Sequence, residues 1–249
     1  MKKILVANWK MNPQDSGEAG KLFSLEGNTK SREIEVVICP PFQLLFLGRK
    51  IKAKLGAQDV FWEESGAYTG EVSPIMLKKM GISYVIVGHS ERRKYLAEND
   101  EMVNKKVLAA AKAGLKVILC VGEPLSIRKK GLSFAKRFVG DQLSRDLRGV
   151  RGSLIIAYEP IWAISRGRTD SVTDSPLDAQ VMARYILFLS VVKKLERNKV
   201  KVIYGGSVTS KNIADFVQYN EISGALVGGA SLKGEEFKKM VKITSQYAK

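Results

Sequence analysis

Eight short apolar runs alternate with eight amphipathic segments, and this alternation limits the fold more than any other feature of the sequence. The apolar runs are nearly continuous, whereas a strand with one face in water alternates apolar and polar residues. Near-continuous runs therefore indicate parallel strands that are buried on both faces. We expect strands at residues 4–9, 34–39, 54–58, 83–88, 116–121, 154–159, 201–205 and 223–228.

The segments between these runs carry apolar residues at helical spacing. Ser73-Pro74 and Ser175-Pro176 each place a capping side chain before a first-turn proline, which is typical of a helix start. We expect helices near residues 15–29, 43–50, 74–80, 98–113, 125–148, 176–197, 210–219 and 232–247.

Eight strands that alternate with eight helices predict an α/β fold with a parallel sheet. The count of eight favours closure into a single (β/α)8 TIM barrel, a catalytic domain that occupies residues 1–249. An open, doubly wound sheet is the alternative architecture. No glycine-rich dinucleotide fingerprint follows the first run, which counts against its commonest version.

The two cysteines, Cys39 and Cys120, each lie inside an apolar run, and we interpret both as reduced core thiols. A disulfide between them is the alternative. The apolar stretch 4–7 is far shorter than the core of an export signal, and no segment approaches the roughly 20 apolar residues of a membrane span. We therefore expect a cytoplasmic protein without membrane contact.

The formal net charge of +16 is the unusual feature of the composition. It fits a nucleic-acid-binding protein, or a protein that attracts a small anionic substrate. The basic residues between 128 and 151 are mixed with apolar residues at helical spacing, which indicates a solvated helix face. No zinc-finger, RNA-recognition or helix-turn-helix signature accompanies them, so we do not expect nucleic acid as a partner.

Polar residues at the carboxyl ends of barrel strands point toward an active site. Here the first run ends in Asn8 and Lys10, the fourth in His89, and the sixth in Glu159. A carboxylate after an apolar run is a candidate general base, although a salt-bridged structural glutamate is the alternative. His89 is the only histidine, so metal sites that need two or three imidazoles are excluded, and a structural histidine is the alternative to a catalytic one.

Two glycine-containing turns follow the last two strands, at Gly205-Gly206-Ser207 and Gly228-Gly229. Glycine lets a backbone approach closely, and free amides at a helix start attract anions. Barrels commonly hold phosphate with these two loops, so the turns favour a phosphate site, with simple tight turns as the alternative.

Five segments at strand ends together resemble the signature segments of triose-phosphate isomerases, in that family's order and near its spacing over the whole chain. They are NWKMN (8–12), GHSERR (88–93), YEPIWAI (158–164), YGGSV (204–208) and LVGGASL (226–232). The resemblance implies an isomerase of glycolysis and gluconeogenesis that interconverts dihydroxyacetone phosphate and D-glyceraldehyde 3-phosphate. It implies a triose phosphate as the substrate, and neither a metal nor an organic cofactor.

The resemblance also implies catalytic roles. Glu159 carries the proton between C1 and C2, and a neutral His89 polarises the carbonyl group; both roles are taken from the family, where they are well established. Lys10 is the third catalytic residue and, with Asn8, contacts the substrate. Glu91 lies near Lys10 as a supporting acid.

The same resemblance implies that Cys120 packs beneath the site. Backbone amides of Ser207, Gly228 and Gly229 hold the phosphate, together with one from the lid that follows Glu159. The sequence departs from the family in that lid, because Ser165 stands where the family more often has glycine. The alternative to an enzyme is a catalytically silent barrel that binds nucleic acid through its charge.

Residues 59–73 are too long for a simple turn and carry three aromatic side chains. Such a loop in a compact fold is usually functional or covered by something. In the family it inserts beside the active site of a second subunit, which implies a homodimer through loop 59–73.

Overall fold

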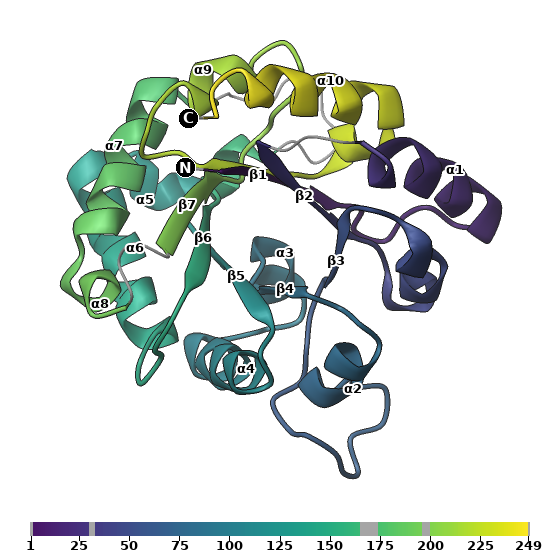
Figure 1. The fold of residues 1–249 in the computed structure, drawn as a ribbon. Helices are drawn as coiled ribbons and strands as arrows, with labels where there is room; N and C mark the ends of the chain where they lie inside the picture. The colour runs from purple at the N-terminus through teal and green to yellow at the C-terminus, as the bar shows by residue number, and fades with distance from the viewer. Residues whose placement is uncertain (1, 30–32, 165–173, 196–199, 249) are drawn as a thin grey trace.

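Eight parallel strands close into a barrel in the order β1 to β8. The computed structural model describes residues 2–29, 33–164, 174–195 and 200–248. Each strand pairs with its neighbours in the sequence, and β1 pairs with β8 to close the ring (Figure 1). The predicted single barrel is therefore confirmed, and the open sheet is excluded. None of the helices in the described part of the chain is long and apolar enough to cross a membrane.

The strands agree with the expected runs to within one residue at nearly every boundary. They are β1 Lys3–Asn8, β2 Ile34–Cys39, β3 Lys54–Ala57, β4 Tyr84–Val87, β5 Lys116–Val121, β6 Leu154–Tyr158, β7 Val200–Tyr204 and β8 Gly224–Val227. All eight runs are buried along nearly their whole length, as parallel strands with helices outside and side chains inside require.

Alternate residues of the strands point to opposite sides of the barrel wall. The inward set forms one apolar cluster that fills the barrel: Ile4, Val6, Val37, Cys39, Tyr84, Ile86, Ile118, Cys120, Ile155, Ala157, Ile203 and Leu226. The interior is thus packed, and it is not a pore. Both cysteines are buried and unpaired, as the sequence predicts.

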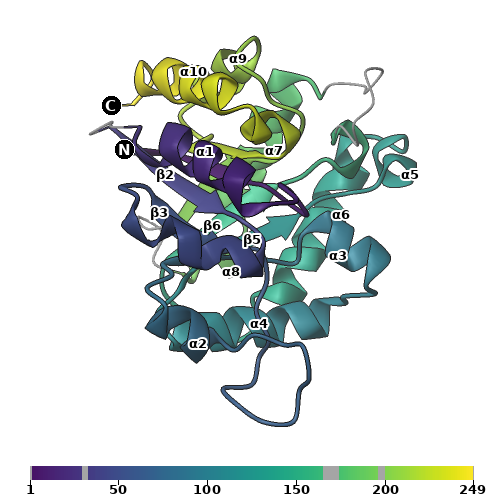
Figure 2. The ribbon, with the colours of Figure 1, turned by 90° about the vertical axis from the view of Figure 1, so that its right-hand side faces the viewer.

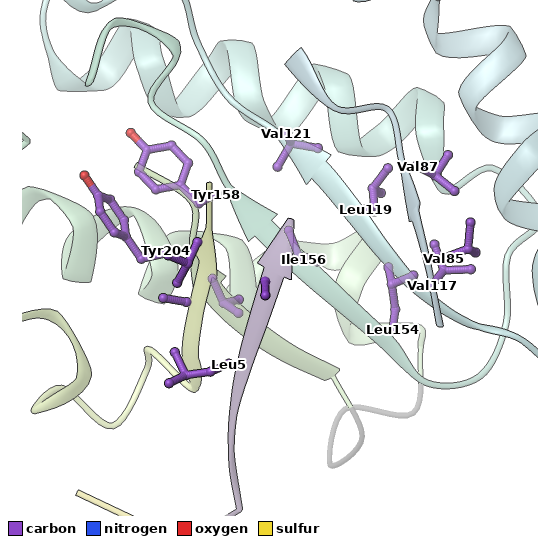
Figure 3. Packing of buried hydrophobic residues seen from close by; sticks show 14 of the residues in the cluster. Leu5, Val85, Val87, Val117, Leu119, Val121, Leu154, Ile156, Tyr158 and Tyr204 are labelled. Atoms are coloured by element: carbon purple, nitrogen blue, oxygen red, sulfur yellow. The ribbon is translucent and has the colours of Figure 1, made fainter. Parts of the chain in front are cut away.

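The outward set packs against the helices in a second, larger cluster. Figure 3 shows part of this layer, where Val85 and Val87 of β4 lie near Val117 and Leu119 of the adjacent β5. The helices that cover the barrel are α1 Ser16–Gly27, η1 Phe42–Lys50, α2 Pro74–Lys79, α3 Ser90–Tyr95, α4 Asp100–Lys112, α5 Leu125–Arg128, α6 Leu132–Asp146, α7 Pro176–Phe188, α8 Ser190–Lys193, α9 Ile213–Val217 and α10 Gly234–Ser245. Two short 3-10 turns, η2 Ile161–Ala163 and η4 Gly229–Leu232, follow β6 and β8.

Three helix predictions need correction. The expected helix 125–148 is two helices, because Gly131 adopts a φ of 111° and interrupts the hydrogen-bond ladder. The expected helix 176–197 ends at Phe188, because Leu189 has an extended ψ of 139°. The segment 43–50 is a 3-10 helix. The short helix α3 is not among the eight expected helices, but it begins where Ser90-Glu91 after His89 indicates a helix start. The cap at Ser73 is confirmed, since its hydroxyl accepts the amide of Met76 at 3.1 Å. Ser175 precedes α7 as expected, but its side chain makes no capping hydrogen bond to a described residue.

The closure between β1 and β8 requires glycine at the first residue of β8. Gly224 has a φ of +152°, and a Cβ there would overlap the carbonyl oxygen of Ile4. We expect Gly224→Ala to lower the free energy of unfolding by at least roughly 2 kcal/mol, from backbone strain and steric overlap. Chemical denaturation measures the change.

Gly20 provides the matched control. It lies exposed within α1, and a Cβ there meets nothing within 4 Å. Gly20→Ala should stabilise the protein by roughly 0.5–1 kcal/mol through helix propensity. Equal effects of the two substitutions would refute the role given to Gly224.

Candidate active site

Every second side chain of a strand points into the barrel, and this alternation continues past the carboxyl ends of the strands. It determines which residues there face the mouth of the barrel. Asn8 follows Ile4 and Val6 in step, and Glu159 follows Ile155 and Ala157. Both side chains are therefore directed to the mouth of the barrel, and both are buried, with exposed fractions of 5% and 2%. The apolar filling of the barrel lies directly beneath them.

Glu159 and His89 form a close pair. The Oε1 of Glu159 lies 3.2 Å from the Nε2 of His89, and both side chains are nearly inaccessible to water. The other carboxylate oxygen accepts the backbone amide of Ser90 at 3.2 Å. Because Ser90 begins α3, the carboxylate lies at a helix N-terminus, where the exposed amides favour negative charge.

The hydrogen bonds of His89 define its tautomer. Nδ1 accepts the backbone amide of Glu91 at 3.2 Å, and His89 thereby caps α3. A nitrogen that accepts a hydrogen bond carries no proton, so the proton of the neutral ring is on Nε2. The N–H of the ring then faces Glu159 and the mouth of the barrel.

Lys10 lies on the same rim in a strained backbone conformation, with a φ of 55°. A left-handed non-glycine residue costs roughly 1–3 kcal/mol and persists only where its surroundings hold it. Here the amide of Lys10 donates to Asn8 Oδ1 at 3.1 Å, and its carbonyl accepts Gln58 Nε2 at 2.8 Å. The ammonium group reaches Glu91 Oε1 at 2.5 Å. Glu91 thus lies between Lys10 and His89, whose Nδ1 is 3.6 Å from its other oxygen.

Two glycines give the Glu159 segment its space. A Cβ on Gly205 would lie 2.7 Å from Glu159 Cγ, and one on Gly122 would overlap the Glu159 carbonyl group.

Cys120 lies inside the barrel beneath Glu159. Burial, and then the neighbouring Glu159 charge, raises the pKa of its thiol, so the thiol stays protonated. A neutral thiol adds no negative charge beside the carboxylate.

The two glycine turns lie beside this rim. Gly228 is in step with the inward residue Leu226, and a Cβ on it would meet Lys10 Cε at 3.3 Å. Neither Gly228 nor Gly229 donates its amide to another described residue. Ser207 differs, because its amide and hydroxyl both donate to the carbonyl of Ala163, at 3.1 and 2.8 Å. Ser165 lies outside the described residues.

A buried carboxyl group fixes the start of the segment that follows Glu159. Glu123 accepts the hydroxyl of Tyr158 at 3.1 Å and the indole N–H of Trp162 at 3.0 Å. Burial is the main reason that the pKa of Glu123 is raised. The guanidinium of Arg128 covers the face of the Trp162 ring at 5.4 Å. The segment is therefore well anchored up to Ala163.

The combined arrangement suits proton transfer. A carboxylate, a neutral imidazole and an ammonium group surround one point at the mouth of the barrel, beside amides available to an anion. Among the described residues no group of three histidine, cysteine or carboxylate side chains is arranged to hold a metal ion.

Known proteins share this arrangement of segments. The family model described as triosephosphate isomerase matches residues 3–244. The chain belongs to the triosephosphate isomerase family. A triosephosphate isomerase of Thermoanaerobacter pseudethanolicus is 45% identical over 246 residues, which cover 96% of this chain and 98% of the relative. Relatives with the same name from Dictyoglomus turgidum and Saccharopolyspora erythraea are each 42% identical and cover 97% and 95% of this chain, and 99% and 94% of their own lengths.

The structure adds three features that the sequence did not suggest for this triosephosphate isomerase family member. The backbone amide of Ser90 donates to Glu159. The helix start after His89 is the sequence feature that could have indicated a free amide at this position. Gly205 leaves room for the side chain of Glu159. Its inward position follows from the alternation along β7, but only once the register of that strand is known. Glu26 of α1 accepts the indole N–H of Trp9 at 3.1 Å, and nothing in the sequence connects these two residues.

Glu26 supports the strained turn at Lys10 from behind. Its side chain is fully buried, and burial raises its pKa to about 8 although the Trp9 hydrogen bond opposes this shift. Its second oxygen has no hydrogen-bond partner among the described residues. A protonated carboxyl group avoids leaving a charge in this position.

This raised pKa makes stability depend on pH. Between about pH 4.5 and 8 the folded chain keeps a proton that the unfolded chain releases, so stability falls as pH rises, by up to about 1.4 kcal/mol per pH unit. Glu26→Gln cannot release a proton, and its stability should therefore fall less steeply between pH 5 and 8. Urea unfolding at fixed protein concentration measures both slopes. Glu18→Gln on the exposed face of α1 is the control, and an unchanged slope in Glu26→Gln would contradict the account.

Gly205 allows a second test. In Gly205→Ala the new Cβ displaces Glu159, and a displacement of about 1 Å can reduce turnover on the order of 10²-fold. We expect isomerase turnover to fall while the far-ultraviolet circular dichroism stays unchanged. Gly20→Ala serves as the control with full turnover. Normal turnover in Gly205→Ala would show that the Glu159 position is not critical.

Proposed function

We propose that this chain interconverts dihydroxyacetone phosphate and D-glyceraldehyde 3-phosphate through an enediolate, as a single-domain enzyme of glycolysis and gluconeogenesis. The names of its relatives support this reaction. The observation that carries the proposal is the pair of Glu159 and His89, 3.2 Å apart at the mouth of the barrel, with Lys10 on the same rim.

In this proposal Glu159 removes the pro-chiral proton from C1 of dihydroxyacetone phosphate. The electron pair of that C–H bond forms a C1–C2 double bond, and negative charge develops on the C2 oxygen. The Nε2–H of His89 donates to this oxygen, and the ammonium of Lys10 lowers the energy of the charge. Glu159 then returns the proton to C2, where the electron pair of the C1–C2 double bond forms the new C–H bond. The hydroxyl proton moves from O1 to the C2 oxygen, so that C1 and O1 form the aldehyde and C2 carries a hydroxyl group. Acid–base groups alone complete this cycle, so it uses no metal or organic cofactor.

The phosphate group has a natural place in this proposal. We assign it to the amides of Gly228 and Gly229 at the start of η4, because neither donates to another described residue and Lys10 lies beside Gly228. The amide of Ser207 joins them once it leaves the carbonyl of Ala163, which links phosphate binding to movement of the segment after Glu159. Ser165 would add its own amide from that segment. Such a lid keeps water from the enediolate, whose phosphate would otherwise be eliminated.

Replacing Glu159 with aspartate tests the role of the base. The shorter side chain withdraws the carboxylate by about one methylene, and we expect turnover to fall on the order of 10²-fold with little change in the Michaelis constant. A coupled assay of isomerase turnover measures the effect. Glu101→Asp, at an exposed position in α4, is the control. Near-normal turnover would remove Glu159 as the base.

We also propose a cytoplasmic homodimer through loop 59–73. Figure 2 shows the connection between β3 and α2 extending away from the body as a long loop, which suits insertion into a second subunit. Within the loop, Phe61 stacks on Trp62 at 4.1 Å and contacts Tyr68, so that Phe61 and Trp62 are half-buried and Tyr68 is exposed.

Large exposed apolar side chains elsewhere on the chain support the dimer more strongly. Met11, next to Lys10, is 83% exposed, and Phe46 in η1 is 65% exposed. Side chains of this size in contact with water favour an interface that covers them. The buried reduced thiols, Cys39 and Cys120, suit a cytoplasmic setting.

Shortening the loop tests the assembly. Replacing residues 65–70 with two glycines keeps Phe61 and Trp62 but removes the tip, and we expect monomers of low activity with all catalytic side chains intact. Sedimentation velocity and turnover are measured on the same sample. A wild-type chain that is monomeric and fully active at nanomolar concentration would contradict the dimer.

A further inference from the structure

A cavity of about 830 Å³ lies at the end of the barrel opposite the candidate active site. It is formed where β1, β2 and β3 begin and where α10 passes over them. This volume is within the range of pockets that hold small molecules. Its apolar floor consists of Ile34, Val36 and Val241, all of them buried.

Lysines dominate the wall of this cavity. Six of them line it, against two glutamates: Lys2, Lys52, Lys54, Lys238, Lys239, Lys242, Glu33 and Glu35. Lys238 pairs with Glu235 at 2.9 Å. Lys2, Lys52, Lys54, Lys239 and Lys242 form no ion pair with any residue in the described ranges. Five cations from three separate segments therefore converge on one concavity, where Glu33 and Glu35 offset only part of their charge.

The neighbourhood of Glu35 shows independently that positive charge is in excess here. Lys116 approaches Glu35 at 3.6 Å, and Lys2 and Lys201 act on the same carboxylate. A hydrogen bond from Tyr84, and then the charges of these lysines, hold the pKa of Glu35 below its usual value despite its burial. Burial, and then repulsion from Lys116 and Lys2, lowers the pKa of Lys201. One carboxylate thus serves several lysines, and the site can accept more negative charge.

The shape of the cavity limits the kind of anion. Among the described residues no aromatic side chain lines it, so the unpaired bases of a nucleic-acid strand find no stacking surface there. A single phosphate would meet only some of the five lysines, whereas a compact chain of phosphates carries enough charge to engage most of them. The apolar floor gives room for an uncharged group attached to that chain.

We propose that this cavity is a binding site for a triphosphate group, carried either by a nucleoside triphosphate or by inorganic polyphosphate. The site is separate from the isomerase centre at the other end of the barrel. It also gives a specific location to part of the +16 charge, which a reaction of a single triose phosphate does not require.

Isothermal titration calorimetry of the full chain with magnesium-free tripolyphosphate, ATP and inorganic phosphate tests the proposal. The test variant is Lys52→Glu with Lys242→Glu. The control is Lys21→Glu with Lys130→Glu, which changes the net charge equally at exposed positions outside the cavity. We expect the test variant to weaken tripolyphosphate binding at least about tenfold, equivalent to 1.4 kcal/mol. The control should change it less than about twofold, and isomerase turnover should stay normal in both.

Comparing ATP with tripolyphosphate distinguishes a nucleoside triphosphate from inorganic polyphosphate as the ligand. ATP that binds more tightly than tripolyphosphate indicates a nucleotide site in which the base contacts the floor, and equal binding indicates free polyphosphate. Binding of both should weaken as salt concentration rises. If tripolyphosphate binding weakened equally in the test and control variants, the lysines would attract the anion only through the overall positive charge, and the proposal would be overturned. No binding, or binding that neither variant weakens, would overturn it as well, and normal turnover in the same samples keeps these results separate from the isomerase proposal.

Discussion

The two-residue period of the strands is the constraint on which the rest of the structure depends. In a closed parallel barrel each strand sends alternate side chains inward, and the inward set must fill the interior. At the carboxyl ends the same parity brings Asn8, Glu159, Gly205 and Gly228 to the mouth of the barrel. A shift of one residue in β6 would turn Glu159 outward to the helices. The site is thus a continuation of the core, which explains why Asn8 and Glu159 are almost fully buried.

Much of this could be predicted from the sequence, and the reasons are physical. Strands buried on both faces have near-continuous apolar runs, so their boundaries were accurate. The strand ends pointed to Lys10, His89 and Glu159 before their contacts were known. Helix interruptions were harder, because Leu189 breaks a helix without any glycine or proline signal. The contact of Glu26 with Trp9 joins separate elements, and a pattern along one segment does not encode it.

Charge is distributed over the two ends of the barrel in different ways. At the carboxyl end each charged group has a defined partner, as Lys10 has in Glu91 and Glu159 has in the amide of Ser90. At the amino end five lysines share a cavity without ion pairs to the described residues. The first arrangement fixes geometry for proton transfer, whereas the second leaves charge available for an anion. A uniformly solvated basic surface accounts for the exposed face of α6 but not for a concave cluster.

The central claim is that the barrel mouth moves a proton between two carbons of a triose phosphate. Isomerisation of dihydroxyacetone phosphate in deuterated water, followed by proton NMR, tests it most directly. If Glu159 carries the proton and exchanges it with solvent while the enediolate exists, part of the D-glyceraldehyde 3-phosphate should carry deuterium at C2. In Glu159→Asp the rate of deuterium incorporation should fall together with turnover, on the order of 10²-fold. Product that forms rapidly with no deuterium at C2 under any condition would indicate direct hydride transfer and contradict the account.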